Sequence, residues 1–536
     1  MRKNVFLVIF AALLCSQVLG QTLVDGIWYN FSGTTAEVTS KYYQSQTPEY
    51  VGDIVIPNTV TYNETTYNVT SIGKWAFYSC KLTSITISEG ITSIDDFAFW
   101  TCSQLYSIVV PNSVTSIGEN AFYGTNWELY HSAGVMYPND KVLYGLSFTL
   151  PVNTVVDIPH GIVSISPGAF SSNHSWASSV SIPESVTNIG KGAFNGLNIT
   201  SINVDSKNET YLSDFGVLIN KKESILLRCP TKKTGNYVIP NNITHIDDFA
   251  FSNCSGLTSV IIPEGVKSIG NNAFYGCSGL SEIIIPNSVT SIGDKAFAGC
   301  SGLVEITIPE GVTNIGHSAF KDCSKLTSVT VPKSVTSIGS YTFNYCNSLV
   351  SIEVNSENAN YTSVDGVLFD KNKTTLICYP SNKAGDYIIP EGVKRLNSYA
   401  FANCNNLVSV TIPSSVTEIE LTVFSGCNSL NTIVNLNPQP VYVEREILKS
   451  GIRLYVPAGS KAAYQNTSYW QFCEIIELPS EFPCEDLEET PDPNYTYRYF
   501  LWGGIESQTK PAKGVNHYRV TFYKGNPTAL DKYKCD

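Results

Sequence analysis

A repeat of 23 residues constrains the fold of this chain more than any other feature. Cysteines show it most clearly, and prolines and Ala-Phe pairs keep the same spacing. Five consecutive cysteines each lie 23 residues from the next: Cys254, Cys277, Cys300, Cys323 and Cys346. A fixed period of this length is typical of a solenoid, in which every repeat forms one coil of a stack. Since 536 residues exceed what a single compact core accommodates, the sequence predicts an array of coils.

The residues of one repeat predict the path of one coil. The consensus is L-x-x-I-x-I-P-x-x-V-x-x-I-G-x-x-A-F-x-x-C, and residues 280–300 match it throughout. Alternation around Ile283 predicts a short strand, which Pro286 ends because proline cannot donate a hydrogen bond to a sheet. The Val and Ile positions that follow predict a second inward-facing segment. Gly293 is expected to allow a turn that a side chain would strain, and Phe297 to fill the interior.

The core of the array is predicted to consist of equivalent side chains from successive coils. One coil cannot bury its own apolar edges, whereas stacked neighbours bury each other's. The predicted structural core contains Phe251, Phe274, Phe297, Phe320, Cys254, Cys277, Cys300 and Cys323.

The cysteine column allows three interpretations. Stacking would bring successive cysteines to about 5 Å, a separation that a disulfide can bridge. A metal site would need four converging ligands, which a one-dimensional column does not supply. We favour a column of small buried thiols, because free cysteine behaves as a small hydrophobe. Outside the column, Cys484 and Cys535 flank the last segment and could pair with each other.

The chain begins with a predicted signal peptide over residues 1–20. Two basic residues, an apolar run from Val5 to Leu14 and small residues ending at Gly20 are typical of such a segment. Lipidation of Cys15 is an alternative, which the bulky residue before it disfavours. No later stretch approaches the ~20 apolar residues of a membrane span. We therefore expect an exported protein, secreted or held at the cell surface, with no membrane span.

Breaks in the period define the other domains. We predict an N-terminal β cap over residues 21–70, the solenoid over 71–436, a C-terminal cap over 437–478, and a linker with a small or mobile tail over 479–536. Hairpin insertions are predicted near residues 125–160, 205–240 and 355–390. In the last two, apolar runs flank a polar, lysine-rich turn, which is the pattern of a β-hairpin.

The repeat resembles a known family. The sequence LTSVIIPEGVKSIGNNAFYGC at residues 257–277 is similar to the BspA-like class of leucine-rich repeats, and the opening DGIWYNFSGTTAEVT and the hairpin GVLFDKNKTTLICYP also resemble it. The resemblance covers roughly residues 21–478. It implies a β-rich solenoid with short helical turns, projecting hairpins and capping strands. It also implies a surface or secreted protein, and for several members attachment to host matrix proteins or to other cells. It implies no reaction and no cofactor, and it names no ligand.

Composition and motifs argue against nucleic-acid binding and catalysis. The net charge is −12 and only 15% of residues are charged, so no basic surface is available to neutralise phosphates. No nucleophile-elbow, zinc-protease or phosphate-loop motif occurs. The pairs Asp95-Asp96 and Asp247-Asp248 could bind calcium or act as acid and base. We interpret them as caps of the short helical turn that carries Ala and Phe. We predict no enzyme, no metal and no cofactor.

The outward positions of the predicted strands form the candidate binding face. They alternate with the inward Leu and Ile, so they share one side of the array. The candidate binding residues are Thr258, Ser259, Ser281, Glu282, Glu305, Thr307, Thr327 and Thr330. Few aromatic anchors lie among them, which indicates weak, multivalent contact or a site elsewhere. The hairpin lysines Lys221, Lys222, Lys371 and Lys373 form an alternative contact surface.

These features predict an adhesin-like scaffold that binds an extracellular protein or glycan, including molecules of the host matrix or cell surface. The alternative is a structural envelope or matrix component that only self-associates. An enzyme in the segment after Leu478 is disfavoured, because that segment is short and holds a single histidine, His517.

Overall fold

The computed structural model describes residues 19–40, 50–130, 135–146, 153–170, 177–443, 451–467 and 469–478, together with four strands of the tail. Contacts divide the chain into two compact units, Met1–Glu223 and Ser224–Asp536. Apart from Leu19 and Gly20, the predicted signal peptide lies outside the described residues, as do Cys15 and Cys484.

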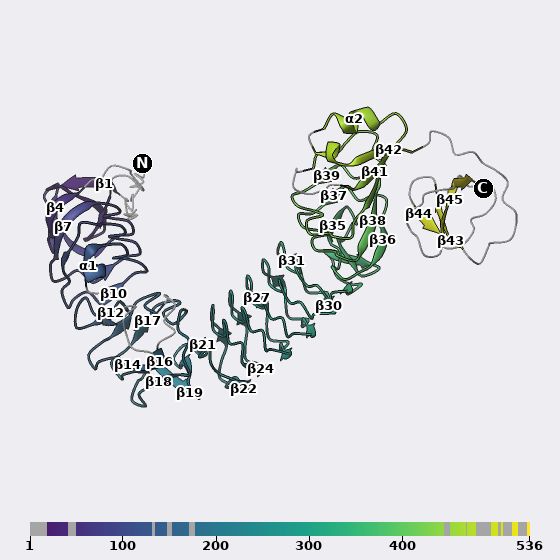
Figure 1. The fold of residues 1–536 in the computed structure, drawn as a ribbon. Helices are drawn as coiled ribbons and strands as arrows, with labels where there is room; N and C mark the ends of the chain where they lie inside the picture. The colour runs from purple at the N-terminus through teal and green to yellow at the C-terminus, as the bar shows by residue number, and fades with distance from the viewer. Residues whose placement is uncertain are drawn as a thin grey trace, which may run out of the picture. The chain divides into compact units, whose positions relative to one another are not determined.

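Each unit is built of solenoid coils, which confirms the predicted fold class (Figure 1). A typical coil contributes one strand to a broad parallel sheet and a two-residue strand to a second parallel sheet. In the coil of residues 280–300 these strands are β26 (Glu282–Ile284) and β27 (Ser291–Ile292). The described helices are short: α1 (Asn126–Tyr130), α2 (Lys461–Gln465) and the 3-10 helix Trp470–Phe472. Within the described part of the chain, no helix has the length and apolarity to cross a membrane.

The strands of the first unit form sheets that alternate along the chain. The N-terminal sheet runs in the order β1 (Leu19–Val24), β2 (Ile27–Ser32), β3 (Thr35–Thr39), β6 (Thr65–Ile72), β8 (Ser93–Ile94) and β10 (Ser116–Ile117), with β5 (Thr59–Tyr62) paired to β6. The others are β4 (Val51–Ile56), β7 (Lys81–Ile87) and β9 (Ser107–Val109); β11 (Val135–Met136) and β13 (Gly145–Leu146); β12 (Val142–Leu143), β15 (Ser164–Ile165) and β17 (Asn188–Ile189); β14 (Thr154–Asp157), β16 (Ala177–Ile182) and β18 (Ser201–Val204); and the hairpin β19 (Tyr211–Asp214) and β20 (Val217–Asn220).

The second unit repeats this arrangement. Its broad sheets are β22 (Gly235–Val238), β24 (Leu257–Ile261) and β26; β28 (Glu305–Thr307), β30 (Ser328–Val331) and β32 (Ser351–Val354); and β36 (Gly385–Ile388), β38 (Leu407–Ile412), β40 (Thr432–Asn435), β41 (Arg453–Val456) and β42 (Glu474–Glu477). The narrow sheets are β21 (Ile225–Arg228), β23 (His245–Ile246), β25 (Ser268–Ile269), β27, β29 (Asn314–Ile315) and β31 (Ser337–Ile338); and β33 (Tyr361–Val364), β34 (Val367–Asp370), β35 (Thr375–Cys378), β37 (Arg395–Leu396) and β39 (Glu418–Ile419). The tail holds an antiparallel sheet in the order β44 (Ile505–Ser507), β43 (Tyr495–Leu501), β45 (His517–Tyr523) and β46 (Tyr533–Cys535).

The segment that carries Ala and Phe is a series of turns, not the helical turn expected from the sequence. Its backbone N–H groups donate alternately to the next coil and to their own coil. The N–H of Phe274 donates to the carbonyl of Ala296 in the next coil at 2.7 Å, whereas the N–H of Cys277 donates back to the carbonyl of Phe274 at 3.2 Å. Asn272 adopts a left-handed φ of 54°, which breaks a helix. Every second N–H in this segment can therefore link two coils, which a helix would not allow.

The phenylalanine side chains form a column of parallel rings inside the second unit. The ring centroids of Phe251 and Phe274 lie 4.8 Å apart, those of Phe274 and Phe297 5.2 Å, and those of Phe297 and Phe320 5.5 Å. All four side chains are fully buried. The ring spacing follows the spacing of about 4.8 Å between paired strands, so each ring fills the interior of one coil.

Gly293 is needed for a different reason from the one expected. Its φ does not lie in the left-handed region. A Cβ atom here would lie 2.6 Å from the carbonyl carbon of Gly270 and 2.7 Å from the backbone nitrogen of Asn271 in the preceding coil. Gly316, one repeat later, has the same restriction, since its Cβ would lie 2.4 Å from the carbonyl carbon of Gly293. These glycines let consecutive coils approach closely.

A buried asparagine precedes the hairpin insertions. The side-chain Nδ2 of Asn358 donates to the carbonyls of Pro332 at 2.8 Å and Val335 at 3.0 Å in the preceding coil. Its Oδ1 accepts the backbone N–H groups two and three residues further on, both at 2.8 Å. Asn139 and Asn208 make the same four kinds of contact in the first unit. One side chain thus satisfies four backbone groups where the chain leaves the regular repeat.

Both ends of the repeat region are covered by additional structure. At the N-terminal side, β2 pairs antiparallel with β1 and β3, and β3 then pairs parallel with β6. At the C-terminal side, β41 and β42 extend the parallel sheet beyond β40. There the fully buried Trp470 donates from Nε1 to the carbonyl of Val441 at 2.9 Å. Tyr464 donates to the carbonyl of Asn437 at 2.8 Å.

Replacing one phenylalanine of the column should make the second unit less stable. Because Phe274 is fully buried between two neighbouring rings, Phe274→Ala should lower the free energy of unfolding by about 3–5 kcal/mol in urea denaturation. The next residue, Tyr275, is 43% exposed, so Tyr275→Ala is a matched control that should cost about 0.5 kcal/mol or less. Equal losses for the two variants would contradict the ring column.

The stability of the protein should also depend on the side-chain amide of Asn358, and a change of one atom can test this. Asn358→Asp keeps the shape but replaces the Nδ2 donor with an oxygen that faces two carbonyls. We expect a loss of about 3 kcal/mol, because buried acceptors lose their donor and a charge is buried. Asn360→Asp, at an exposed position of the same insertion, is the control. Thermal denaturation of both variants measures the difference, and a stable Asn358→Asp protein would rule out this role.

Candidate functional site

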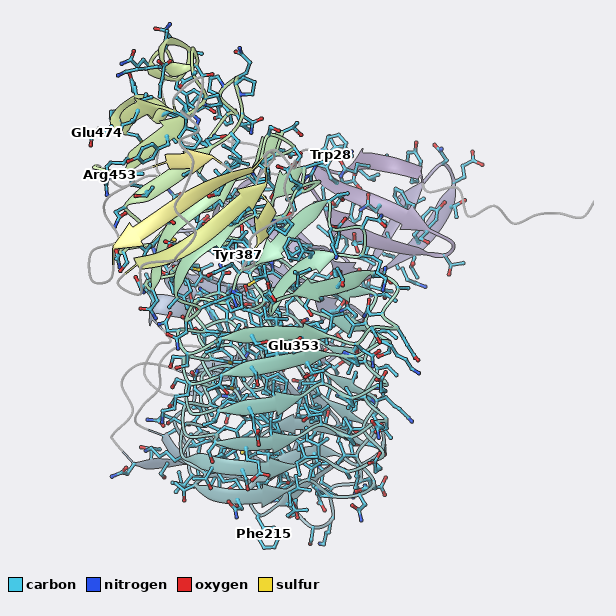
Figure 2. All side chains as sticks on the ribbon, turned by 90° about the vertical axis from the view of Figure 1, so that its right-hand side faces the viewer. Trp28, Phe215, Glu353, Tyr387, Arg453 and Glu474 are labelled. Atoms are coloured by element: carbon cyan, nitrogen blue, oxygen red, sulfur yellow. The ribbon has the colours of Figure 1, made fainter. Side chains whose placement is uncertain are left out.

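The broad sheets of the second unit present one face of parallel strands to solvent (Figure 2). We call the outward positions of β22, β24, β26, β28, β30 and β32 the strand face, and Figure 2 shows Glu353 upon it. Parallel pairing aligns Ser259 with Glu282, and Glu305 with Ser328. Equivalent residues of successive coils therefore form rows, with about 4.8 Å between strands.

Six of the eight candidate binding residues lie on this face, and the other two, Ser281 and Thr327, directly precede β26 and β30. Their inward neighbours Ile283 and Ile306 are buried, which fixes the direction of the outward side chains. Ser259 is half-buried, and the others are exposed: Thr258, Ser281, Glu282, Glu305, Thr307, Thr327 and Thr330.

Side chains at the start of the strands form hydrogen bonds to neighbouring strands. The hydroxyl of Thr258 donates to Oδ1 of Asn236 at 2.8 Å, and that of Ser281 to the carbonyl of Thr258 at 3.2 Å. Thr327 donates to the carbonyl of Val304 at 3.4 Å. These contacts order the side chains, so a partner would meet a surface that is already arranged.

The hairpin lysines form a smaller alternative surface than the sequence suggests. Lys221 Nζ donates to the carbonyl of Asn208, and Lys371 Nζ to that of Asn358, both at 2.5 Å. Lys221 and Lys371 thus donate within their own hairpin insertions, although all four candidate lysines are exposed. The second hairpin itself lies against its coil, since its residues 367–369 are fully buried.

The cysteine column is a set of free, fully buried thiols. From Cys277 to Cys346, each thiol donates to the carbonyl of the phenylalanine in the preceding coil, as Cys277 does to Phe251 at 3.0 Å and Cys300 to Phe274 at 3.2 Å. Cys254 donates instead to the carbonyl of Pro230 at 3.5 Å. Burial raises the pKa of the Cys323 thiol to about 12. Since the thiolate is the reactive form, these cysteines are poor nucleophiles and poor metal ligands.

The second aspartate of each pair contacts the next coil. Asp248 Oδ1 accepts the N–H of Asn271 in the next coil at 2.6 Å, and Asp96 Oδ1 accepts the N–H of Glu119 at 2.9 Å. The equivalent Asn271 accepts the N–H of Asp294 in the following coil at 2.8 Å. Capping by Asp95 and Asp247, which replace the glycine of the repeat, stays a prediction. The second aspartate of each pair links two coils.

The part of the chain that the structure describes contains no group of three or more His, Cys, Asp and Glu residues placed to hold a metal. His245 lies within hydrogen-bonding distance of the Thr244 hydroxyl, with 2.8 Å between Oγ1 and Nδ1. His317 packs its ring against Tyr341 at 4.9 Å between centroids.

A cluster of aromatic rings in the first unit was not predicted from the sequence. The ring of Trp75 stacks on Phe97 at 4.3 Å and on Trp100 at 5.0 Å between centroids. Trp75 and Phe97 have φ values of 61° and 58°, at the position that Asn272 occupies in a later coil. Asparagine is favoured in this conformation and bulky aromatics are not. Aligning the repeats at this one position would have revealed the cluster.

A family model described as BspA type leucine rich repeat region matches residues 53–133, 147–215, 229–350, 267–385 and 377–447. Together these segments cover more than half of the chain. No curated protein matches the chain significantly.

Several solved structures are similar to this chain. A leucine rich cell surface protein from Faecalibacterium prausnitzii A2-165 is 27% identical, covers 63% of this chain and 95% of its own, and has a TM-score of 0.38. The pneumococcal vaccine antigen PcpA is 21% identical, with coverages of 75% and 98% and a TM-score of 0.37. A leucine-rich repeat protein from Bacteroides ovatus ATCC 8483 is 21% identical, with coverages of 85% and 100% and a TM-score of 0.32. Because these TM-scores are low, the family assignment depends on the repeat model alone.

The thiols of the column should be unreactive in the folded protein. At mildly alkaline pH, iodoacetamide should leave Cys254, Cys277, Cys300 and Cys323 unlabelled, because they are fully buried. In concentrated guanidinium chloride all four should be labelled, as mass spectrometry of peptides will show. Rapid labelling of the native protein, or a mass deficit of two hydrogens that links two cysteines, would contradict the free buried column.

Proposed function

Because this chain belongs to the BspA-type leucine-rich repeat family, we propose that it is an exported, non-catalytic scaffold whose strand face binds an extracellular protein or glycan. It is secreted or displayed at a cell surface, where it acts in an adhesin-like manner. Its partners include molecules of the host matrix or cell surface.

The strand face is the observation that carries this proposal. Its outward side chains are exposed on strand after strand, while the inward side chains fill a continuous core. A sheet held by ladder hydrogen bonds does not need to reorganise on binding, so less conformational entropy is lost.

Repetition of the surface supports a multivalent mode of binding. Equivalent rows recur on β24, β26, β28 and β30, and they consist largely of hydroxyl and carboxylate side chains. Individual contacts of this kind are weak, but several linked contacts raise the overall affinity. A repetitive partner, such as a matrix protein or a polysaccharide, fits this arrangement.

The buried thiols support a non-catalytic role. The thiols of the cysteine column are enclosed in the core, and burial raises the pKa of Cys300 well above its usual value. Leucine-rich repeats share a scaffold and not one ligand, so the partner must be found by experiment.

The strand face can be tested with two matched variants. Residues 21–536 are measured against a panel of matrix proteins, cells and polysaccharides. Thr307→Arg with Thr330→Arg should weaken binding about tenfold or more, because two large charges are added to the face. Thr290→Arg with Thr313→Arg changes two exposed threonines next to the narrow strands β27 and β29, and should leave binding unchanged.

Two outcomes would argue against this function. Equal binding by both variants would exclude the strand face. Filaments that form with rising concentration, without binding to any panel member, would instead favour a structural component that self-associates.

A further inference from the structure

One row of the strand face is apolar over three consecutive strands. Val238 pairs in register with Ile261, and Ile261 with Ile284. Their side chains are 59%, 50% and 62% exposed, respectively. Contiguous exposed aliphatic side chains on a soluble surface are typical of an interaction site.

The fold does not require aliphatic residues in this row. On the following strands the same position is occupied by Thr307, Thr330 and Glu353. These strands carry the same inward core and the same parallel pairing. The three aliphatic side chains are therefore not explained by the packing of the coil.

The neighbouring row places two carboxylates together. Glu282 and Glu305 occupy equivalent positions of consecutive coils, where serine is found on β24 and β30. β26 and β28 belong to different sheets but lie next to each other, and like charges at short separation repel. Within residues 235–354, all of which the structure describes, neither glutamate has an ion pair.

Positive charge is absent from the strands that carry this face. The sequences of β22, β24, β26, β28, β30 and β32 contain no lysine and no arginine. The lysines of the same stretch lie in the turns or next to the narrow sheet: Lys267, Lys295, Lys321, Lys325 and Lys333. Charge is thus segregated, and the carboxylates of the face meet no internal cation.

We propose that Val238, Ile261, Ile284, Glu282 and Glu305, here called the acidic–aliphatic patch, bind a short polypeptide segment in which lysine or arginine alternates with aliphatic residues. This inference rests on the proposed function of the strand face and names the chemistry of its partner. The apolar row spans three strands, about 10 Å, which three or four extended residues can cover. Basic side chains of the segment meet the two carboxylates, and its aliphatic side chains cover the row.

A polypeptide fits this patch better than a glycan. Sugar hydroxyls need hydrogen-bond partners, and an aliphatic row offers none. A basic peptide leaves no polar group unpaired on the row and neutralises the repulsion between the glutamates.

The test uses the mature chain and three fluorescent peptides of equal length. The first alternates lysine with isoleucine, the second lysine with serine, and the third glutamate with isoleucine. Fluorescence polarisation should show binding of the first, with affinity at least about tenfold higher than for the other two. Its affinity should fall as salt is added, since exposed charge pairs are screened.

Variants can use residues that the fold already holds at equivalent positions. Ile261→Thr with Ile284→Thr, and Glu282→Ser with Glu305→Ser, should each weaken binding of the first peptide about tenfold without lowering the melting temperature. Thr307→Ile should extend the apolar row and strengthen binding. Glu264→Ser with Glu310→Ser removes two exposed carboxylates outside the strands and should have no effect.

The inference is overturned if the lysine–isoleucine peptide does not bind, if all three peptides bind equally, or if the patch variants retain full affinity. Such a result leaves the proposed function open to its own test. Binding to matrix proteins, cells or polysaccharides that is lost in the Thr307→Arg and Thr330→Arg protein would still identify the strand face as a binding surface.

Discussion

Each coil of this protein is completed by hydrogen bonds to its neighbours. In the turn that carries Ala and Phe, N–H groups donate alternately within the coil and to the next coil. This sharing requires a close approach of backbones, which explains why Gly293 and Gly316 have no room for a Cβ atom. It also places the thiol of Cys277 against the carbonyl of Phe251. The consensus residues of the repeat are therefore those that can pack against the equivalent residue of the next coil.

The same constraint determines which positions of the repeat can vary without a change of fold. Inward positions are fixed by the core, and the turn positions are fixed by contacts between coils. Outward strand positions are free of both, and the equivalents of Ile284 are threonine on β28 and β30 and glutamate on β32. Variation there leaves the fold unchanged and alters the surface. A scaffold of this kind can thus acquire a local binding site, such as the acidic–aliphatic patch, by changing a few side chains.

The period and its inward and outward positions could be predicted from the sequence, because they follow from spacing alone. The column of Phe274 and its neighbours is an example. What could not be predicted depends on which atoms of adjacent coils meet. Spacing shows that Asp248 and Asn271 are neighbours, but not that the carboxylate of one accepts the N–H of the other. Asn358 and Asn208 occupy the same place in two similar insertions, but that likeness does not show which four backbone groups each side chain contacts.

Removing part of the chain tests the central claim that each coil is held by its neighbours in a repeating register. Deleting residues 281–303 removes one full period and joins equivalent positions, so every remaining coil keeps a matching neighbour. Deleting residues 281–292 removes about half a coil and places strand residues against turn residues. Denaturant unfolding should remain cooperative for the first deletion and be lost for the second. Equal disruption by both deletions, or a cooperative transition in the second, would contradict the account.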